Sequence, residues 1–274
     1  MAKGKDEHKM LFDLRGGRRG QVVKVVYALL AVLMGLSLFL VIGGFNLAEL
    51  FNDSTSTGDA AKPYEEQAER IQVKLKKDPD NPDLLLSLTR TQVNTGNTQV
   101  TVEPGGQQAF TPEAVQAYEE ADQTWSEYLK ATDEPNVSLA LLMAPTLLKL
   151  AEFSRSYPEA ETNVQAATEA QQIVAKERPS VNAFTTLAYY TYFTGDFAAA
   201  EKAEKEAKKL ATGKTQVQEI DKQLSEIEKN ARRYLAAKEK AEKEAKAAGG
   251  GNGNPGAIEP GENPFGAGGG LSGP

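Results

Sequence analysis

The side chains that most often carry enzyme chemistry are scarce in this chain. Its 274 residues include one histidine, His8, and no cysteine. Since His8 belongs to the N-terminal arm, the rest of the chain cannot build a Ser-His-Asp triad, a Cys-His pair or a His/Cys zinc site. The sequence also has no phosphate-binding G-x-x-x-x-G-K-[ST] loop, no G-x-S-x-G motif and no glycine-rich dinucleotide motif.

Carboxylates are the remaining candidates for acid–base chemistry. Glu119, Glu120 and Asp122 stand close together in the sequence, and a glycosidase needs only two carboxyl groups. These residues fall on an alanine-rich helical pattern with lysines nearby, which is typical of a solvated helix face. We therefore expect a protein that is not an enzyme and that has no metal or cofactor site.

An apolar segment, residues 25–45, indicates whether the chain is attached to a membrane. No charged residue occurs between Lys24 and Glu49. A helix of about 20 apolar residues spans the hydrocarbon core of a bilayer, roughly 30 Å. The sequence predicts one transmembrane helix and no later one. A cleaved signal peptide is the alternative, but its apolar region is shorter and ends at a small-residue cleavage site.

The charges beside this segment predict its orientation. Residues 1–24 carry seven basic and three acidic groups, a net +4, and the first basic residue after the segment is Lys62. Basic residues near a span stay on the cytoplasmic side. We expect a cytoplasmic arm at 1–24 and a single-pass protein of the cytoplasmic (inner) membrane, with its C-terminal part outside the cytoplasm. The total charge of −7 leaves −11 after residue 24, which disfavours nucleic acid as a partner.

The part after the span has the composition and periodicity of helices. Residues 52–61 are small and polar, and we expect a flexible tether over residues 46–62. From residue 63 onward, apolar residues recur at helical spacing between proline and glycine breaks. Gly96 is expected to stop the second helix, and Thr111 with Pro112 to begin the third. The predicted helices cover about residues 63–77, 84–95, 112–131, 137–154, 158–176, 181–193 and 197–211.

Two of these helix pairs share a pattern of apolar and small residues. Counted from Gly195, the matching positions are Phe184, Leu187 and Ala188, which precede it by eleven, eight and seven, and Ala200 and Ala207, which follow it by five and twelve. Counted from Gly96, they are Leu85 and Leu88, which precede it by eleven and eight, and, after an insertion at 98–110, Ala114, Tyr118 and Ala121 at spacings of four and three.

This pattern resembles the tetratricopeptide repeat (TPR), a 34-residue helix-turn-helix unit. The match covers residues 181–212 and, with the insertion, 82–134, and it is degenerate over 137–179. Thr191 and Glu204 depart from it, because they stand where the family usually has aromatic residues. The resemblance implies an all-α fold, with a TPR-like helix-turn-helix α-solenoid at 63–213 behind a single N-terminal transmembrane helix.

The resemblance also implies a protein-binding groove, because the first helix of each pair lines the concave face of such arrays. The positions that would face inward include Asn182, Thr185, Tyr189, Tyr192 and Phe193 in one pair and Arg90 in another. Tyrosines suit an extended peptide, since they offer apolar area and a hydroxyl. The alternative is packing between helices, because residues 189–193 span more than one helix face.

The insertion at 98–110 has two possible structures. Val100 and Val102 alternate with polar residues before Pro104-Gly105-Gly106, which favours a small β-hairpin. An irregular loop is the alternative. Insertions in repeat proteins gather on one face and sometimes bind a partner.

The C-terminal part divides into a helix and a tail. Residues 214–248 predict a capping helix with an apolar seam at 217–234, followed by a solvated stretch with pairs such as Glu239 with Lys243 and Glu242 with Lys246. Residues 249–274 are rich in glycine and proline, so we expect disorder.

The layout resembles that of bacterial membrane-anchored TPR proteins, including those associated with the translocon. We expect a protein–protein interaction adaptor on the extracytoplasmic face of the cytoplasmic membrane, with a partner in an envelope or secretion complex. One alternative is a holdase-like chaperone or translocon-associated accessory factor for secreted chains. Another is a structural protein of the bacterial cell envelope that self-associates through 217–234.

Overall fold

The computed structural model describes residues 57–102, 108–247 and 258. The chain divides into two units, 1–55 and 56–274, and the described residues all belong to the second. The predicted arm at 1–24, the transmembrane helix at 25–45 and the first part of the tether therefore lie outside them. None of the helices α2–α9 combines the length and apolar character that a membrane crossing needs.

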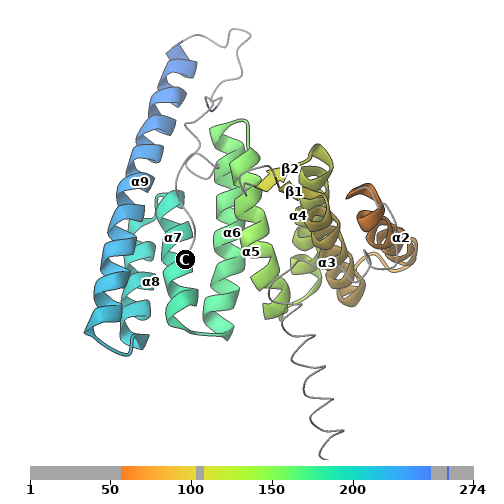
Figure 1. The fold of residues 1–274 in the computed structure, drawn as a ribbon, viewed down its shortest axis with the longest axis horizontal. Helices are drawn as coiled ribbons and strands as arrows, with labels where there is room; N and C mark the ends of the chain where they lie inside the picture. The colour runs from red at the N-terminus through yellow and green to blue at the C-terminus, as the bar shows by residue number, and fades with distance from the viewer. Residues whose placement is uncertain (1–56, 103–107, 248–257, 259–274) are drawn as a thin grey trace, which may run out of the picture. The chain divides into compact units, whose positions relative to one another are not determined.

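The second unit is a row of helices, which confirms the all-α fold class and gives it a solenoid-like arrangement. Figure 1 shows the helices side by side in chain order from α2 to α9. Their bounds are α2 Thr57–Leu75, α3 Pro82–Thr98, α4 Pro112–Ala131, α5 Val137–Phe153, α6 Tyr157–Glu177, α7 Val181–Thr194, α8 Phe197–Leu210 and α9 Lys214–Ala247. Each helix packs on its neighbours, and α3 also contacts α5 and α7 contacts α9.

Side-chain caps explain why the helices begin where they do. Thr111 accepts a hydrogen bond from the backbone N–H of Ala114 at 3.1 Å, with Pro112 in the first turn, as predicted. Asn136 caps α5 in the same way, and Ser180 caps α7. These oxygens satisfy N–H groups that have no partner within the helix. The helix starts predicted near 112, 137 and 181 are confirmed for this reason.

The turn between α7 and α8 confirms the role predicted for Gly195. This glycine ends α7 in the left-handed conformation, with φ 86°, which a residue without Cβ adopts at no steric cost. Ala188, Ala200 and Ala207 are fully buried on the two helices that the turn connects. Small side chains at these positions let α7 and α8 approach closely.

The prediction that Gly96 stops a helix was wrong. Helix α3 continues to Thr98, and Gly96 lies buried inside it. A Cβ at this position would lie 2.4 Å from Cε1 of Tyr118 on α4. Gly96 therefore provides space for the Tyr118 ring rather than a turn.

The tether prediction of 46–62 was wrong over its last six residues. Helix α2 already begins at Thr57 and continues through Pro63. Ala61 is fully buried, so packing holds this segment helical although its composition is that of a linker. Tertiary burial outweighs the weak local preference here.

The insertion forms the hairpin that its alternating valines favoured. Strands β1 Val100–Val102 and β2 Gln108–Phe110 pair antiparallel, with Val100 opposite Phe110 and Thr101 opposite Ala109. Strand β2 leads through Thr111 directly into α4. This short connection holds Phe110 at the N-terminal end of α4, beside α5.

Helix α9 confirms the predicted capping helix. Its seam is buried against the rest of the core and comprises Ile220, Leu224, Ile227, Ala231 and Tyr234, with Val217 partly buried. The predicted pair of Glu239 with Lys243 is present at 2.5 Å, whereas Glu242 pairs with Lys238 at 3.8 Å. Since the seam is covered by helices of the same chain, it is not exposed for the self-association considered from the sequence.

Candidate functional site

Four of the six groove residues predicted from the sequence lie in the core. Thr185, Tyr189, Tyr192 and Phe193 are each less than 5 % exposed. The ring of Phe193 packs edge-on against Tyr189, with 5.6 Å between centroids, and lies 6.0 Å from Tyr234 on α9. These aromatic residues join α7 to α9, so the alternative of helix packing describes them and a ligand does not reach them in this fold.

Tyr192 is part of a polar chain between three helices. Its hydroxyl donates a hydrogen bond to Oε2 of Glu204 on α8 at 2.9 Å. Lys208 pairs with Oε1 of Glu204 at 2.5 Å and also with Asp221 on α9. Burial and the nearby Glu204 both raise the pKa of Tyr192. Glu204 stands where the repeat pattern usually has an aromatic residue. Its carboxylate is satisfied here by the Tyr192 hydroxyl and by Lys208.

Buried threonines contribute small, locally satisfied side chains. Thr185 donates its hydroxyl to the carbonyl of Val181 at 2.8 Å, and Thr191 donates to the carbonyl of Leu187 at 2.7 Å. Each hydroxyl bonds within its own helix, so burial leaves no polar group unsatisfied. Thr185 is therefore a packing residue and not part of a binding surface.

The other two predicted residues are exposed. Asn182 lines a groove between α5 and α7, which we call the α5–α7 groove. Its volume is about 400 Å³, and it is lined by Leu141, Pro145, Gln171, Val174, Arg178, Ser180, Asn182, Ala183, Thr186 and Tyr190. Arg90 lies exposed on α3 and is not one of these residues. The structure therefore does not bring Arg90 and Asn182 together in one site.

A larger groove lies where the hairpin meets α4, α5 and α6, and we call it the hairpin groove. It has a volume of about 560 Å³ and is lined by Phe110, Pro112, Val115, Gln116, Glu119, Phe153, Arg155 and Glu159. A smaller hollow of about 190 Å³ shares Val115, Glu119, Phe153 and Glu159 with it and adds Asp122, Gln123, Leu150 and Asn163. The shared residues make the two hollows parts of one surface feature.

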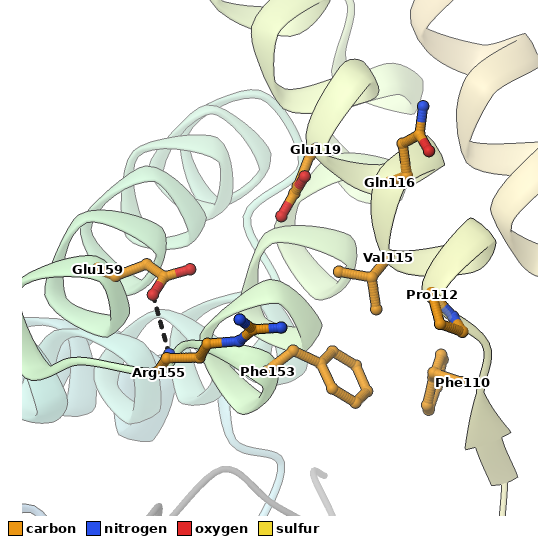
Figure 2. Close-up of a pocket in the computed structure, with 8 residues that line it drawn as sticks. All are labelled: Phe110, Pro112, Val115, Gln116, Glu119, Phe153, Arg155 and Glu159. Carbon is orange, nitrogen blue, oxygen red and sulfur yellow. Dashed lines mark hydrogen bonds between the residues drawn. The ribbon is translucent and has the colours of Figure 1, made fainter. Parts of the chain in front are cut away.

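The hairpin groove has an apolar part and a charged part. Figure 2 shows Phe110, Val115 and Phe153 converging from β2, α4 and α5. The centroids of the Phe110 and Phe153 rings are 4.9 Å apart, and Nζ of Lys149 lies 5.1 Å from the Phe110 centroid. Glu119, Glu159 and Arg155 surround these rings. Apolar anchors within a polar rim are typical of a protein-binding site.

The local electrostatics of the groove are acidic. Three carboxylates, those of Glu119, Asp122 and Glu159, line the groove and its adjoining hollow, against two cations, the lining Arg155 and Lys149 beside Phe110. The backbone N–H of Arg155 donates to Oε2 of Glu159 at 2.9 Å, which orients this carboxylate (Figure 2). Burial raises the pKa of Asp122, and it raises the pKa of Glu152 at the end of α5 to about 7 against the opposing effect of Lys149. An acidic groove favours basic side chains in whatever binds there.

The residues described by the structure include no cluster of three or more histidine, cysteine, aspartate or glutamate side chains that could hold a metal ion. Sequence reasoning identified the insertion as a possible binding surface but missed Phe110, Phe153 and Arg155. The available signal was the aromatic residue that ends the insertion, directly before the Thr111 cap. The other two residues flank the α5–α6 connection, and only the fold places them beside the hairpin.

No protein-family model matches this chain, and neither a curated protein nor a solved structure matches it.

Proposed function

We propose that this chain is a membrane-anchored, TPR-like adaptor that binds a protein partner outside the cytoplasm through its hairpin groove. The groove carries the proposal, because it joins two partly buried aromatic anchors, Phe110 and Phe153, to an acidic rim. The partner that fits is a polypeptide segment with apolar and basic side chains. A subunit of an envelope or secretion complex is the class of partner that this location implies.

The geometry of the α7–α8 pair supports the TPR-like assignment. The left-handed Gly195 turn and the fully buried Ala188, Ala200 and Ala207 are what the repeat pattern requires. The α3–α4 pair departs from it, because Gly96 lies within the helix. The pairing is nevertheless preserved, with a small residue of α3 against the large Tyr118 of α4.

The exposed apolar surface supports a defined groove more than a general chaperone. Within the described ranges, the exposed large hydrophobic side chains are Val73, Leu141 and Leu210, which lie on α2, α5 and α8. Holdases present extended apolar patches, whereas scattered single side chains are normal on any surface. The adaptor proposal therefore has more support than the chaperone alternative.

The membrane anchor and orientation rest on the sequence. A reporter that is active only outside the cytoplasm, fused after Ala248, should be active because seven basic residues precede the apolar segment. Activity only from an N-terminal fusion would show the inverted orientation. The partner would then be cytoplasmic.

Site-specific photocrosslinking in membranes tests the groove. A photoreactive residue at Gln116, which lines the groove, should give one dominant adduct that the same probe at the exposed Lys205 on α8 does not give. Phe110→Ala should weaken capture about thirtyfold, since truncation of an aromatic anchor commonly costs about 2 kcal/mol. Glu119→Lys should weaken capture, and most strongly at low salt. Glu219→Lys, at an exposed position of α9, should leave capture unchanged.

Other crosslinking results would favour a different function or a different binding site. Many adducts of different sizes that persist in Phe110→Ala would favour the chaperone. An adduct of the chain with itself would favour the structural role. Equal yields from the probes at Gln116 and Lys205 would remove the hairpin groove as the binding site, and the α5–α7 groove would be the next surface to probe.

A further inference from the structure

The C-terminal tail contacts the helical unit at Ile258. The backbone N–H of Ile258 donates a hydrogen bond to the carbonyl oxygen of Arg155 at 3.2 Å. Its side chain is partly buried and packs against the hydrophobic core. Disorder was predicted for the whole of 249–274, so at this residue the structure differs from the prediction. An isoleucine side chain is suited to such a contact, because its apolar surface gains from burial.

The turn that receives Ile258 is held by its own hydrogen bonds. The N–H of Arg155 donates to Glu159 at 2.9 Å, and the N–H of Glu159 donates to Oγ of Ser156 at 3.4 Å. Ser154 donates its hydroxyl to the carbonyl of Leu150 at 3.0 Å and accepts from Asn163 at 3.0 Å. The Arg155 carbonyl is therefore a preorganised acceptor, and little conformational freedom is lost when a donor binds it.

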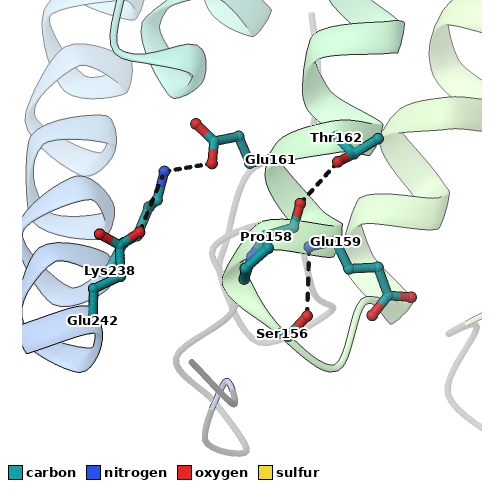
Figure 3. Close-up of polar contacts among 7 residues, drawn as sticks. All are labelled: Ser156, Pro158, Glu159, Glu161, Thr162, Lys238 and Glu242. Atoms are coloured by element: carbon teal, nitrogen blue, oxygen red, sulfur yellow. Dashed lines mark hydrogen bonds and ion pairs between the residues drawn. The ribbon is translucent and has the colours of Figure 1, made fainter. Parts of the chain in front are cut away.

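Helix α9 brings the start of the tail to the same end of α6. Figure 3 shows Lys238 on α9 beside Glu161, in the first turns of α6, close to the Ser156 cap. The Lys238–Glu161 ion pair measures 2.6 Å, and Ala241 packs partly buried on the core. From Lys238 to Ala247 the helix rises about 14 Å. The eleven residues from there to Ile258 can extend about 36 Å, which exceeds this rise and is long enough for Ile258 to reach the end of α6.

We propose that the C-terminal tail is a ligand of its own helical unit, bound in cis at the α5–α6 turn through the side chain and backbone N–H of Ile258. One hydrogen bond and one partly buried side chain give only weak affinity, with a Kd on the order of millimolar or above for a separate peptide. A linker of this length supplies an effective concentration in the millimolar range. The docked state within one chain is therefore populated up to about half, and docking between chains is negligible.

This contact lies at the edge of the hairpin groove, because the Arg155 side chain lines the groove while its carbonyl binds the tail. The inference does not depend on the proposed adaptor function. It concerns the tail and the α5–α6 turn, whatever the groove binds.

Cysteine crosslinking in the full-length chain tests the proposal, because the natural sequence has no cysteine. The variant Arg155→Cys, Ala257→Cys leaves Ile258 in place and changes an exposed side chain at the turn. A short bis-maleimide should join the two cysteines within one chain. Adding Ile258→Asp should slow this crosslink by about tenfold or more, while Ile258→Leu should preserve it, since only aspartate opposes burial.

The control pair is Lys205→Cys with Ala257→Cys, which samples the same tail against α8. Its crosslinking rate should be low and should not respond to Ile258→Asp. Equal Arg155–Ala257 rates for isoleucine, leucine and aspartate at 258 would overturn the proposal, provided that helical circular dichroism is unchanged. A crosslink that joins two chains, and that depends on protein concentration, would overturn its cis form.

Discussion

Replacing Gly96 by alanine tests the close contact between α3 and α4. An added Cβ would lie 2.4 Å from Cε1 and 2.7 Å from Cδ1 of Tyr118, far inside van der Waals contact. The ring cannot move away freely, because it is fully buried and its hydroxyl donates to Oδ1 of Asn97 at 2.8 Å. The Phe110 ring, 6.4 Å away between centroids, limits its movement further.

The expected effect is a balance of three contributions. Alanine in place of glycine within a helix gains about 1 kcal/mol in intrinsic preference. Overpacking costs about 1–3 kcal/mol, and a displaced Tyr118 would lose its hydrogen bond to Asn97, worth about 1 kcal/mol. We expect Gly96→Ala to lower the free energy of unfolding by about 1–3 kcal/mol. In a protein of this size, each kcal/mol lowers Tm by about 2–4 °C.

Thermal unfolding of the purified chain, followed by circular dichroism, measures this difference. Gly213→Ala is the matched control, because nothing lies within 4 Å of the position that its Cβ would take. Alanine at this position stabilises the fold by lowering the entropy of the unfolded chain, but it is a poorer residue than glycine at the start of α9. Because the two effects oppose each other, we expect the free energy of unfolding to change by less than about 0.5 kcal/mol.

A double-mutant cycle identifies the cause. In a Tyr118→Leu background the cost of Gly96→Ala should shrink by at least about 1 kcal/mol, because the clashing ring is gone. Additive effects would show that the Tyr118 ring is not the obstacle. A rise in Tm for Gly96→Ala alone, as for a glycine in an exposed helix, would refute the close packing of α3 on α4.

Two further predictions concern packing and pH. Ala188→Leu on α7 should lower the free energy of unfolding by about 1–3 kcal/mol, because Ala188 is fully buried. Ala198→Leu, at an exposed position of α8, should leave it within about 0.5 kcal/mol. Equal melting temperatures would argue against the α7–α8 alignment. Burial raises the pKa of Glu152 from 4.5 to about 7. The folded state therefore favours the protonated carboxyl, and the contribution of Glu152 to stability falls as the pH rises from 4.5 through 7. Glu152→Gln should therefore gain about 1–2 kcal/mol at pH 8, a value reduced for its partial exposure, and almost nothing at pH 4. Equal gains at both pH values, in urea unfolding, would contradict this pKa.

The helix boundaries of this protein follow from local rules. Thr111 with Pro112, Asn136 and Ser180 each mark the start of a helix and Gly195 marks the end of one, because a cap or a left-handed turn needs only residues within about four positions. Such signals are readable without any tertiary contact. The all-α class and the long final helix could be predicted for the same reason.

The candidate site could not be predicted in this way. Tyr189 and Tyr192 have the chemistry of groove residues, but whether an aromatic side chain faces a ligand or a neighbouring helix depends on contacts beyond its own helix. Here both side chains are buried, and the hydroxyl of Tyr192 bonds to Glu204 on α8. The hairpin groove likewise needs Phe110 and Phe153, 43 residues apart in the sequence, to lie within 4.9 Å.

The sequence by itself therefore determined the helices, the ends that a local cap or a left-handed turn marks, and the residue types available for binding. Only the tertiary structure decided which faces are buried, that Gly96 packs against Tyr118 instead of ending a helix, and that α9 returns to α6. The Lys238–Glu161 pair joins residues 77 positions apart. Hydrogen bonding within a helix depends on residues that are near in the sequence. Burial depends on which distant segments pack together, and the periodicity of apolar residues does not identify those segments.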